Sequence, residues 1–246
     1  MPYIYGRNPV TEALEHGQPV QKIYVQFGSK NERVQKIYTL ARQKNISIVT
    51  ADIKKLSQMV GGVTHQGVVA LISPVELVPL EKYLENTDVE GPQCLLLADR
   101  IQDPHNLGAI IRSAEVLGAQ GIVISQRDSV PITDTVMKAS SGAVFNLSIY
   151  QSDNLSRAVR QLQDHGFRVL GAMLKDEATP LWETDFSGDC AIVIGSEFKG
   201  IREGLEKNCD TLFYIPQTGK TQSLNASVAA GIILGEVARQ RTQETE

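Results

Sequence analysis

The 246-residue sequence lacks several features that would assign a protein to a class directly. No stretch approaches the roughly 18 uncharged apolar residues that cross a membrane, and the N-terminus has no apolar run like that of a signal peptide. Cysteine is scarce: Cys94, Cys190 and Cys209 never form C-x-x-C, and two of them begin apolar, strand-like runs. We therefore expect a cytoplasmic protein whose thiols are buried and reduced.

Motifs for common cofactors and metals are also missing. No predicted strand is followed by G-x-G-x-x-G, which argues against a dinucleotide fold and against a Rossmann-type methyltransferase. Residues 218–221 resemble the tail of a phosphate-binding loop, but the first glycine of that motif would fall on Tyr214. The histidines lack the spacing of metal ligands and are better explained as surface or turn residues: His16, His65, His105 and His165. No metal site is predicted.

The chain as a whole has no excess of basic charge, since its formal charge is −4. RNA binding normally needs a basic surface, because phosphates must be neutralised. The charge is unevenly distributed, however. Residues 1–75 carry nine lysines and arginines against four acidic residues, a net +5, whereas residues 76–246 carry −9. An RNA contact and an ordinary solvated surface explain this basic segment equally well. Its basic residues are Arg7, Lys22, Lys30, Arg33, Lys36, Arg42, Lys44, Lys54 and Lys55.

Hydrophobic periodicity predicts a small α/β unit at the N-terminus, in residues 1–75. Proline and glutamate then dominate Glu76–Glu90, a composition typical of a linker, which we place at residues 76–92. A helical turn is expected there, around Glu81–Glu85. The expected elements of the N-terminal unit are helices at 7–16, 31–44 and 53–59 and strands at 19–27, 46–50 and 67–72.

Residues 93–246 alternate between strand-like and helical patterns, which predicts an α/β domain with a parallel sheet covered on both faces. In the helix near 107–117, Leu107, Ile110, Ala114 and Leu117 recur at helical spacing and form the expected buried stripe. Arg112 lies off this stripe, so its guanidinium can serve another role. The expected strands are 94–98, 121–125, 167–173, 191–195 and 211–215, and the further helices are 134–140, 155–165 and 224–241.

The first polar motif, residues 103–112 (D-P-H-N-L-G-A-I-I-R), stands where a strand ending at Asp99 turns into this helix. A purely structural explanation is open. Asp103 and Asn106 could be turn and N-cap residues, and Arg112 could pair with Glu115 one turn later.

Two further motifs follow later strands. Gly195-Ser-Glu-Phe-Lys-Gly200 begins where an apolar strand ends, and the missing side chain of Gly195 would let the backbone approach a ligand closely. A strand-ending turn would also explain this glycine. Ser223-Leu-Asn-Ala-Ser227 begins the last helix, where Ser223 could simply be the N-cap.

Together, and in this order, the three motifs resemble those of the SPOUT-class RNA 2′-O-ribose methyltransferases, the SpoU or TrmH family. Asn106, Gly108 and Arg112 match N-x-G-x-x-x-R, and the second motif matches G-x-E-x-x-G through Gly195, Glu197 and Gly200. Many relatives carry smaller or acidic residues where this chain has Phe198-Lys199. The resemblance implies that S-adenosylmethionine is the cofactor, with Gly195, Ile215 and Leu224 in contact with it. It implies a catalytic set of Asn106, Arg112, Glu197, Ser223 and Asn225.

The resemblance also implies the architecture. Residues 93–246 are similar to the SPOUT domain, whose C-terminal segment forms a trefoil knot, a rare exception to the rule that chains are unknotted. Residues 1–75 resemble the accessory RNA-binding domain, related to ribosomal protein L30e, that bacterial ribosomal-RNA members carry. Residues 5–14 and 64–68 are typical of that group, which includes the 23S rRNA guanosine 2′-O-methyltransferases. Family members are homodimers in which this arginine, Arg112 here, acts at the partner's site.

Two other functions stay open. A transfer-RNA methyltransferase of the same superfamily would keep the motifs but usually lacks such an N-terminal domain. A non-catalytic RNA-binding module would not need the catalytic set. For a methyltransferase, Arg112 is a poor general base, because the pKa of a guanidinium exceeds about 12. We expect it instead to lower the pKa of the ribose hydroxyl and to stabilise the developing negative charge.

Overall fold

The computed structural model describes residues 3–29, 31–73, 75–85, 90–196, 199–219 and 223–243. Contacts divide the chain into two compact units. The smaller consists of Met1–Leu77 with the short segment Pro131–Asp134, and the larger contains Val78–Val130 and Thr135–Glu246. Among the described residues, no helix is long and apolar enough to cross a membrane.

In the described residues, the smaller unit is a four-stranded sheet with three helices, close to the pattern that periodicity predicts. Only β1 was not predicted. Two helices, α1 and α2, bury their apolar faces in one core cluster, and α3 packs Leu56 into another with Val69 and Ala51. The strand order is β1-β4-β2-β3, with β2 and β3 parallel and the other pairs antiparallel. The elements are β1 (Tyr3–Tyr5), α1 (Arg7–Glu15), β2 (Val20–Gln26), α2 (Glu32–Gln43), β3 (Ser47–Ala51), α3 (Ile53–Met59) and β4 (Val68–Ile72).

Residues 5–14 and 64–68, the two segments of this unit that carry the family resemblance, contact each other. Arg7, the first residue of α1, donates from Nε to the backbone oxygen of Gln66 at 3.1 Å. Gln66 itself has a positive φ of 52°. The neighbouring His65 is a buried turn residue: its Nδ1 accepts from the backbone N–H of Gly67 at 3.1 Å, and its Nε2 lies 3.1 Å from Ser57 Oγ. The turn before β4 is therefore held against the start of α1.

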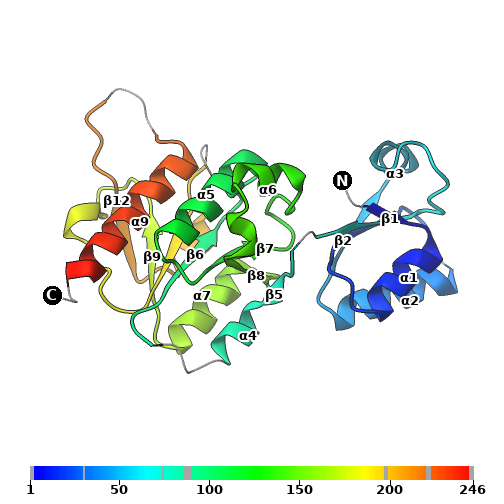
Figure 1. Ribbon diagram of the computed structural model, residues 1–246, viewed down its shortest axis with the longest axis horizontal. Helices are drawn as coiled ribbons and strands as arrows, with labels where there is room; N and C mark the ends of the chain where they lie inside the picture. The colour runs from blue at the N-terminus through cyan, green and yellow to red at the C-terminus, as the bar shows by residue number, and fades with distance from the viewer. Residues whose placement is uncertain are drawn as a thin grey trace. The chain divides into compact units, whose positions relative to one another are not determined.

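The larger unit is built on a sheet of eight parallel strands, counted among the described residues, in the order β10-β12-β9-β11-β6-β7-β8-β5 (Figure 1). The predicted parallel α/β fold is confirmed. Its strands are β5 (Val78–Pro79), β6 (Cys94–Ala98), β7 (Gly121–Ser125), β8 (Ser148–Ser152), β9 (Arg168–Ala172), β10 (Thr179–Pro180), β11 (Cys190–Ile194) and β12 (Thr211–Tyr214). The helices are α4 (Leu80–Leu84), α5 (Pro104–Val116), α6 (Asp134–Ala139), α7 (Leu155–Asp164), α8 (Glu203–Glu206) and α9 (Ala226–Gln243), with short 3-10 turns η1 (Ala143–Phe145) and η2 (Leu181–Glu183).

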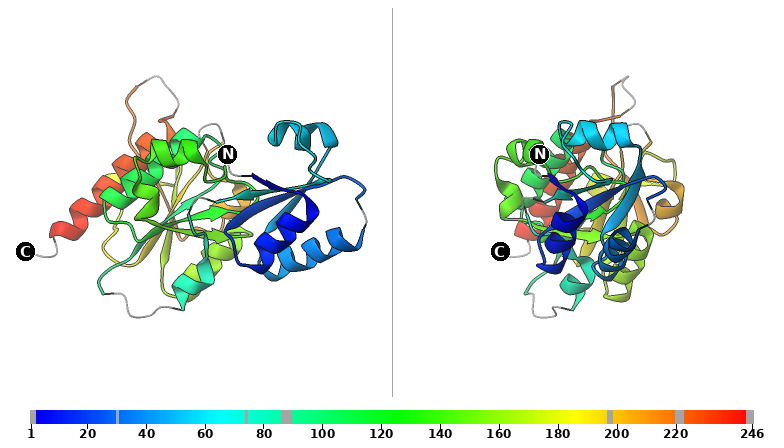
Figure 2. Two further views of the ribbon diagram at one scale, coloured as in Figure 1. Left: turned by 45° about the vertical axis from the view of Figure 1, so that its right-hand side comes forward. Right: turned by 90° about the vertical axis from the view of Figure 1, so that its right-hand side faces the viewer.

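Helices cover both faces of this sheet. Alternate residues of the central strands, such as Leu95, Val123 and Val193, point into one core cluster together with α4, α7 and α8. On the other face α5 and α9 lie side by side (Figures 1 and 2). The stripe expected on α5 is buried at Leu107, Ile110 and Ala114, whereas Leu117 is half-buried because the helix ends there.

Part of the segment expected to be a linker is built into the larger unit. β5 pairs with β8, and α4 buries Leu80 and Leu84 in the core. Tyr83 of this helix packs its ring 5.1 Å from that of Tyr150 in β8. The expected helical turn is α4 itself. β8 was not predicted, because its sequence S-I-Y-Q-S is largely polar and lies next to the edge strand.

The last helix is anchored at its C-terminal end. Arg241 donates to the backbone oxygens of Pro92 and Gln93 at 2.9 Å each and to that of Gly188 at 3.0 Å. Gln240 donates to the oxygen of Thr184 at 2.9 Å. Of the three cysteines expected to be buried, Cys94 and Cys190 are buried in this region as register partners on β6 and β11, whereas Cys209 is half-buried. These contacts join α9 to the amino ends of the central strands.

We predict that Gly121→Ala destabilises the larger unit by about 1–3 kcal/mol, because its Cβ would lie 2.5 Å from the Tyr150 ring and force the core to repack. Urea unfolding of the full-length protein measures this. Gly188→Ala is the matched control, since nothing lies within 4 Å of its added Cβ, and it should change stability by less than about 0.5 kcal/mol. Equal stability of the two variants would contradict the packing argument.

Candidate active site

The strand order reverses at β6 and β11, which are neighbours in the middle of the sheet. From β6 the chain moves through α5 to β7 on one side, and from β11 it moves through α8 toward β12 on the other. In open α/β sheets, ligands bind in the crevice outside the carboxyl ends of the strands at such a reversal. The loops that follow these two strands contain the first and second sequence motifs.

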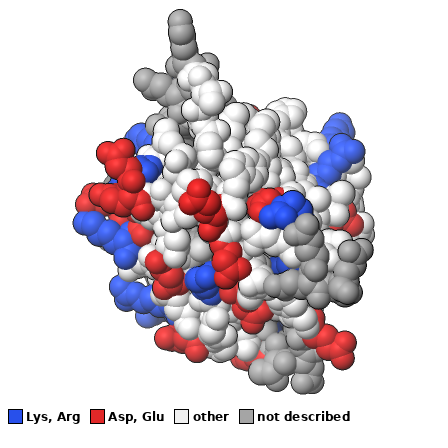
Figure 3. All heavy atoms as spheres, turned by 90° about the vertical axis from the view of Figure 1, so that its left-hand side faces the viewer, with Lys and Arg blue, Asp and Glu red and all other residues white. Residues whose placement is uncertain are grey.

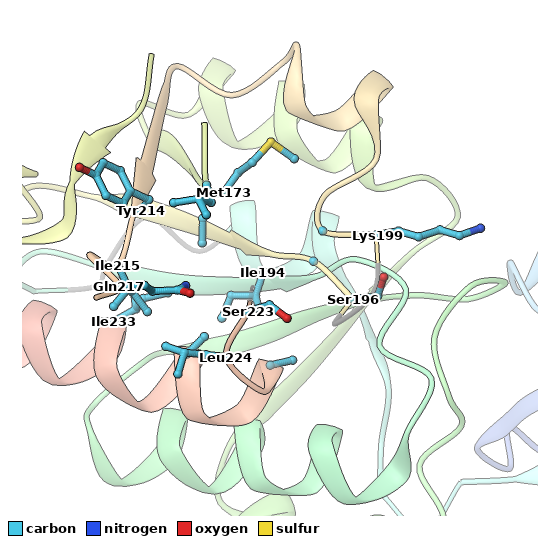
Figure 4. Close-up of a pocket in the computed structure, with 16 residues that line it drawn as sticks. Met173, Ile194, Ser196, Lys199, Tyr214, Ile215, Gln217, Ser223, Leu224 and Ile233 are labelled. Atoms are coloured by element: carbon cyan, nitrogen blue, oxygen red, sulfur yellow. The ribbon is translucent and has the colours of Figure 1, made fainter. Parts of the chain in front are cut away.

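A cavity of about 470 Å³ opens at the carboxyl end of β11. Apolar side chains from β11, the segment after β12 and α9 form one side of it, while Ser196 and Lys199 lie at the opposite side (Figure 4). The predicted cofactor residues Gly195, Ile215 and Leu224 all line this cavity, as does Ser223. The apolar lining comprises Ala172, Met173, Leu174, Ile194, Ile215, Leu224, Ala226, Ala229 and Ile233.

Gly195 is required by a close approach within its own loop. A Cβ at this position would lie 2.1 Å from the backbone carbon of Gly200, which no side chain could tolerate. Gly200 has a positive φ of 58°, and its N–H donates to the oxygen of Ser196 at 2.8 Å. We expected Gly195 to let a ligand approach the backbone. Its missing side chain is also what allows the loop to fold back on itself. Glu197, the predicted functional glutamate, lies outside the described residues, as does Phe198.

Ion pairs between a half-buried arginine and two carboxylates, one of them buried, join the loops that follow β6, β7 and β11. Asp99, fully buried at the end of β6, accepts from the backbone N–H of Arg202 at 2.9 Å and from its Nε at 2.7 Å. The same guanidinium contacts Asp128, after β7, at 2.9 Å. Burial opposes the charge of Arg202, but its hydrogen bonds to Asp99 and Asp128 outweigh burial and raise the pKa of the guanidinium. Sequence reasoning missed this pair, although a charged residue directly after the apolar run L-L-L-A was a signal.

A second cavity of about 390 Å³ adjoins the first, and the two share Ser196, Lys199 and Ala226. Its lining comes mainly from the loops after β6 and β7. The remaining lining residues are Arg100, Ile101, Gln102, Asp103, Asn106 and Asp128.

Two predicted catalytic asparagines contact each other, and one of them, Asn106, lines this cavity. Asn225 donates from Nδ2 to Asn106 Oδ1 at 3.0 Å, across 119 positions of sequence. Its own Oδ1 accepts from the backbone N–H of Ser227 at 2.9 Å and of Val228 at 3.3 Å. Asn225, and not Ser223 as the sequence suggested, therefore caps α9. Because capping fixes which amide atom faces the helix, the Nδ2 group must face Asn106.

Arg112 lies apart from the other predicted residues. Its side chain is exposed on α5, lines neither cavity, and donates to Ser141 Oγ at 3.1 Å. The pairing considered with Glu115 is not among the ion pairs of the described residues. At the start of the same helix, Asp103 is the N-cap and accepts from the N–H of His105 at 2.8 Å. One chain thus assembles Asn106, Asn225, Ser223 and the cofactor residues, but not Arg112.

The two adjoining cavities lie where the strand order of the parallel sheet reverses. This is the arrangement of an α/β protein that can hold two ligands side by side. The chain belongs to the SpoU rRNA methylase family, whose model matches residues 93–235. A second family model, described as RNA 2′-O ribose methyltransferase substrate binding, matches residues 3–78. The resemblance read from the three motifs is confirmed.

Similar proteins cover the whole chain. A protein of Staphylococcus haemolyticus, assigned by name to the TrmH family of tRNA/rRNA methyltransferases, is 37% identical over 98% of this chain and 96% of its own. The AdoMet-bound rRNA methyltransferase from Sinorhizobium meliloti has a TM-score of 0.61 and 25% identity, with 96% of this chain and 86% of that chain covered. The SpoU methyltransferase AviRb from Streptomyces viridochromogenes has a TM-score of 0.63 and 25% identity, with 98% and 90% covered.

We predict that Asn225→Ala lowers the free energy of unfolding by about 0.5–2 kcal/mol, because α9 loses its cap. Asn225→Asp should lose less, since a carboxylate accepts from the same N–H groups and suits a helix N-terminus. Urea unfolding of both variants is the measurement. Equal losses would mean that the amide contact with Asn106, which neither variant keeps, outweighs the cap.

Proposed function

We propose that this protein transfers a methyl group from S-adenosylmethionine to a ribose 2′-hydroxyl of RNA, with a guanosine of 23S ribosomal RNA as the target. The observation that carries the proposal is the pair of cavities with a shared wall at Ser196, Lys199 and Ala226. A methyl donor in one and a nucleotide in the other would lie side by side, and such positioning supplies much of the rate of a displacement reaction. The names of similar proteins leave transfer RNA as the alternative target.

The residues around the first cavity suit the cofactor. Its volume lies within the roughly 300–1,000 Å³ of small-molecule sites, and its apolar side, with Ile215 and Leu224, suits an adenine ring. Ser196, Gln217 and Ser223 offer polar groups for the remainder of the molecule. When bound, S-adenosylmethionine supplies an activated methyl group on a sulfonium. In support, a similar structure at 25% identity is an AdoMet-bound rRNA methyltransferase.

We assign the catalytic role to five residues: Asn106, Arg112, Glu197, Ser223 and Asn225. Asn225 orients the amide of Asn106 through the 3.0 Å contact at the wall of the second cavity. There the amide can hold the ribose in line with the methyl group. Arg112 would lower the pKa of the 2′-hydroxyl and stabilise the charge that develops on its oxygen.

A homodimer would bring Arg112 to the site. Within one chain this arginine lines neither cavity, so we propose that it reaches the cavities of the partner subunit. Large apolar side chains stand exposed on the two paired helices, Val116 on α5 at 69% and Val228 on α9 at 49%, and a partner could cover them. We also propose that the C-terminal segment of this chain forms the trefoil knot of the family.

Residues 1–75 are proposed as the RNA-binding domain, 76–92 as the linker and 93–246 as the methyltransferase domain. Within the proposed linker, β5 and α4 are built into the larger unit. The family model described as substrate binding matches residues 3–78, and residues 1–75 carry a net charge of +5. On the face of the larger unit in Figure 3, acidic and basic side chains are interspersed around an uncharged area. Because the proposed RNA substrate lies in the cytoplasm, we place the protein there as well.

The function is tested by incubating the protein with labelled S-adenosylmethionine and RNA from cells that lack it, followed by nucleoside analysis. We predict 2′-O-methylguanosine as the product. Arg112→Ala should reduce the rate about 10²- to 10⁴-fold with stability unchanged, since its side chain is exposed. Arg160→Ala, exposed on α7, is the control and should retain full activity. Full activity of Arg112→Ala would refute the catalytic role.

Mixing the Arg112→Ala chain with an Asn106→Ala chain tests the shared site. If each site takes Arg112 from the partner, a heterodimer contains one intact site, and activity returns on subunit exchange. Continued inactivity after demonstrated exchange would count against the shared site.

We further predict that Lys54→Gln with Lys55→Gln weakens RNA binding and lowers the salt dependence of the affinity. Both lysines are exposed on α3 of the smaller unit, and each lost phosphate contact lowers the slope of log K against log salt by about 0.7–0.9. Lys82→Gln with Lys207→Gln, two exposed lysines of the larger unit, is the control. Equal slopes for both pairs would argue against the RNA-binding role of residues 1–75.

A further inference from the structure

We infer that Lys199 binds the phosphodiester that adjoins the target ribose, and that it belongs to the acceptor site rather than to the cofactor site. The inference rests on the proposed function. It concerns a residue that lies between the matched positions of the second motif, Gly195 and Gly200.

Lys199 stands where the two cavities meet. It lines both of them, together with Ser196 and Ala226. Figure 4 shows its side chain extending away from the apolar side of the first cavity, where Ile215 and Ile233 lie. Its ammonium group is therefore directed away from the surface that suits an adenine ring.

The backbone that follows Lys199 is held in place, and Ser196 is bound to it. Ser196 and Gly200 form a bridge, and Arg100 donates from Nη2 to the oxygen of Gly200 at 3.1 Å. Two residues further along, Arg202 is fixed by the buried carboxylate of Asp99. The long, flexible side chain of Lys199 thus projects from backbone that is anchored at the next residue, Gly200.

Charge distinguishes Lys199 from the other ionised groups that line the second cavity. Arg100 lies 3.4 Å from Asp99, and Asp128 lies 2.9 Å from Arg202. Asp103 is occupied in part as the cap of α5. Lys199 makes no ion pair or hydrogen bond with any residue that the structure describes, so its charge can meet the anion of a ligand.

The chemistry of a nucleotide indicates which anion Lys199 binds. The 2′-oxygen and the 3′-phosphodiester are attached to adjacent carbons of the ribose, so a 2′-hydroxyl presented at the shared wall places its phosphate beside that wall. Lysine is a compact point charge with three donors and suits a phosphate whose exact orientation varies. Such a contact positions the nucleotide without reading its base. The carboxylate of the cofactor is the other anion within reach of this residue, and the two sources can be separated by measurement.

The test compares Lys199→Ala, Lys199→Gln and Lys199→Arg with the wild type in the full-length protein. We expect the KM for RNA to rise about 3- to 10-fold in the first two variants and to stay near normal in the third. The salt slope of RNA affinity should fall by about 0.7–0.9 in the first two, while calorimetry should give an unchanged Kd for S-adenosylmethionine. Lys207→Ala, whose partner is Glu203 on α8, should match the wild type in every measurement.

The possible failures are distinct. A weaker Kd for the cofactor with an unchanged salt slope for RNA would assign Lys199 to the cofactor carboxylate and overturn the inference. Unchanged KM and salt slope in an active enzyme would overturn it as well, while leaving the proposed function intact. If the wild type transferred no methyl group to any RNA, the proposed function would fail, and the salt slopes alone would decide whether Lys199 contacts phosphate.

Discussion

The candidate site depends on one buried carboxylate. Asp99 has no exposed surface, and three donors of Arg202, its backbone N–H, Nε and Nη2, all lie within 2.9 Å of it. Replacing Arg202 would remove both side-chain donors from this buried carboxylate and leave it the longer contact with Arg100, 3.4 Å away. A buried charge that loses hydrogen-bond partners destabilises the fold. Since the pair joins the exits of β6 and β11 and reaches Asp128 after β7, it fixes the loops around both cavities in a single arrangement.

Small residues and capped helices determine how closely the parts of the site approach one another. Gly195 allows the loop after β11 to fold back on Gly200, and Asn225 begins α9 while it touches Asn106 at the start of α5. Each of these residues has a structural role and lies at the site as well. A functional explanation of the motifs and a purely structural one are therefore not alternatives here: the geometry of the turn or cap is what places the functional group.

Periodicity predicted most of the fold because the central strands and α5 bury regular apolar patterns. It missed β1, β8 and β10 and did not place β5 in the sheet, since short or polar segments such as S-I-Y-Q-S and V-P become strands only through neighbours distant in sequence. The motifs predicted the residues that line the first cavity, Gly195, Ile215 and Leu224. They could not predict that Asp99 pairs with Arg202, 103 positions away, because a one-dimensional pattern contains no information on tertiary contacts. That Arg112 stands apart from the other site residues of its own chain agrees with the expectation from the family resemblance that it acts at a partner's site.

The strand order also determines when this protein can first work during its synthesis. β6 lies between β7, which follows it closely in sequence, and β11, which begins about a hundred residues later at Cys190. The first cavity needs still later residues, up to Ile233 on α9. Because domains fold as their chains emerge from the ribosome and non-local parallel pairing is slow, a nascent chain has no complete site while α9 remains in the exit tunnel. The site is therefore completed only once α9 has left the exit tunnel.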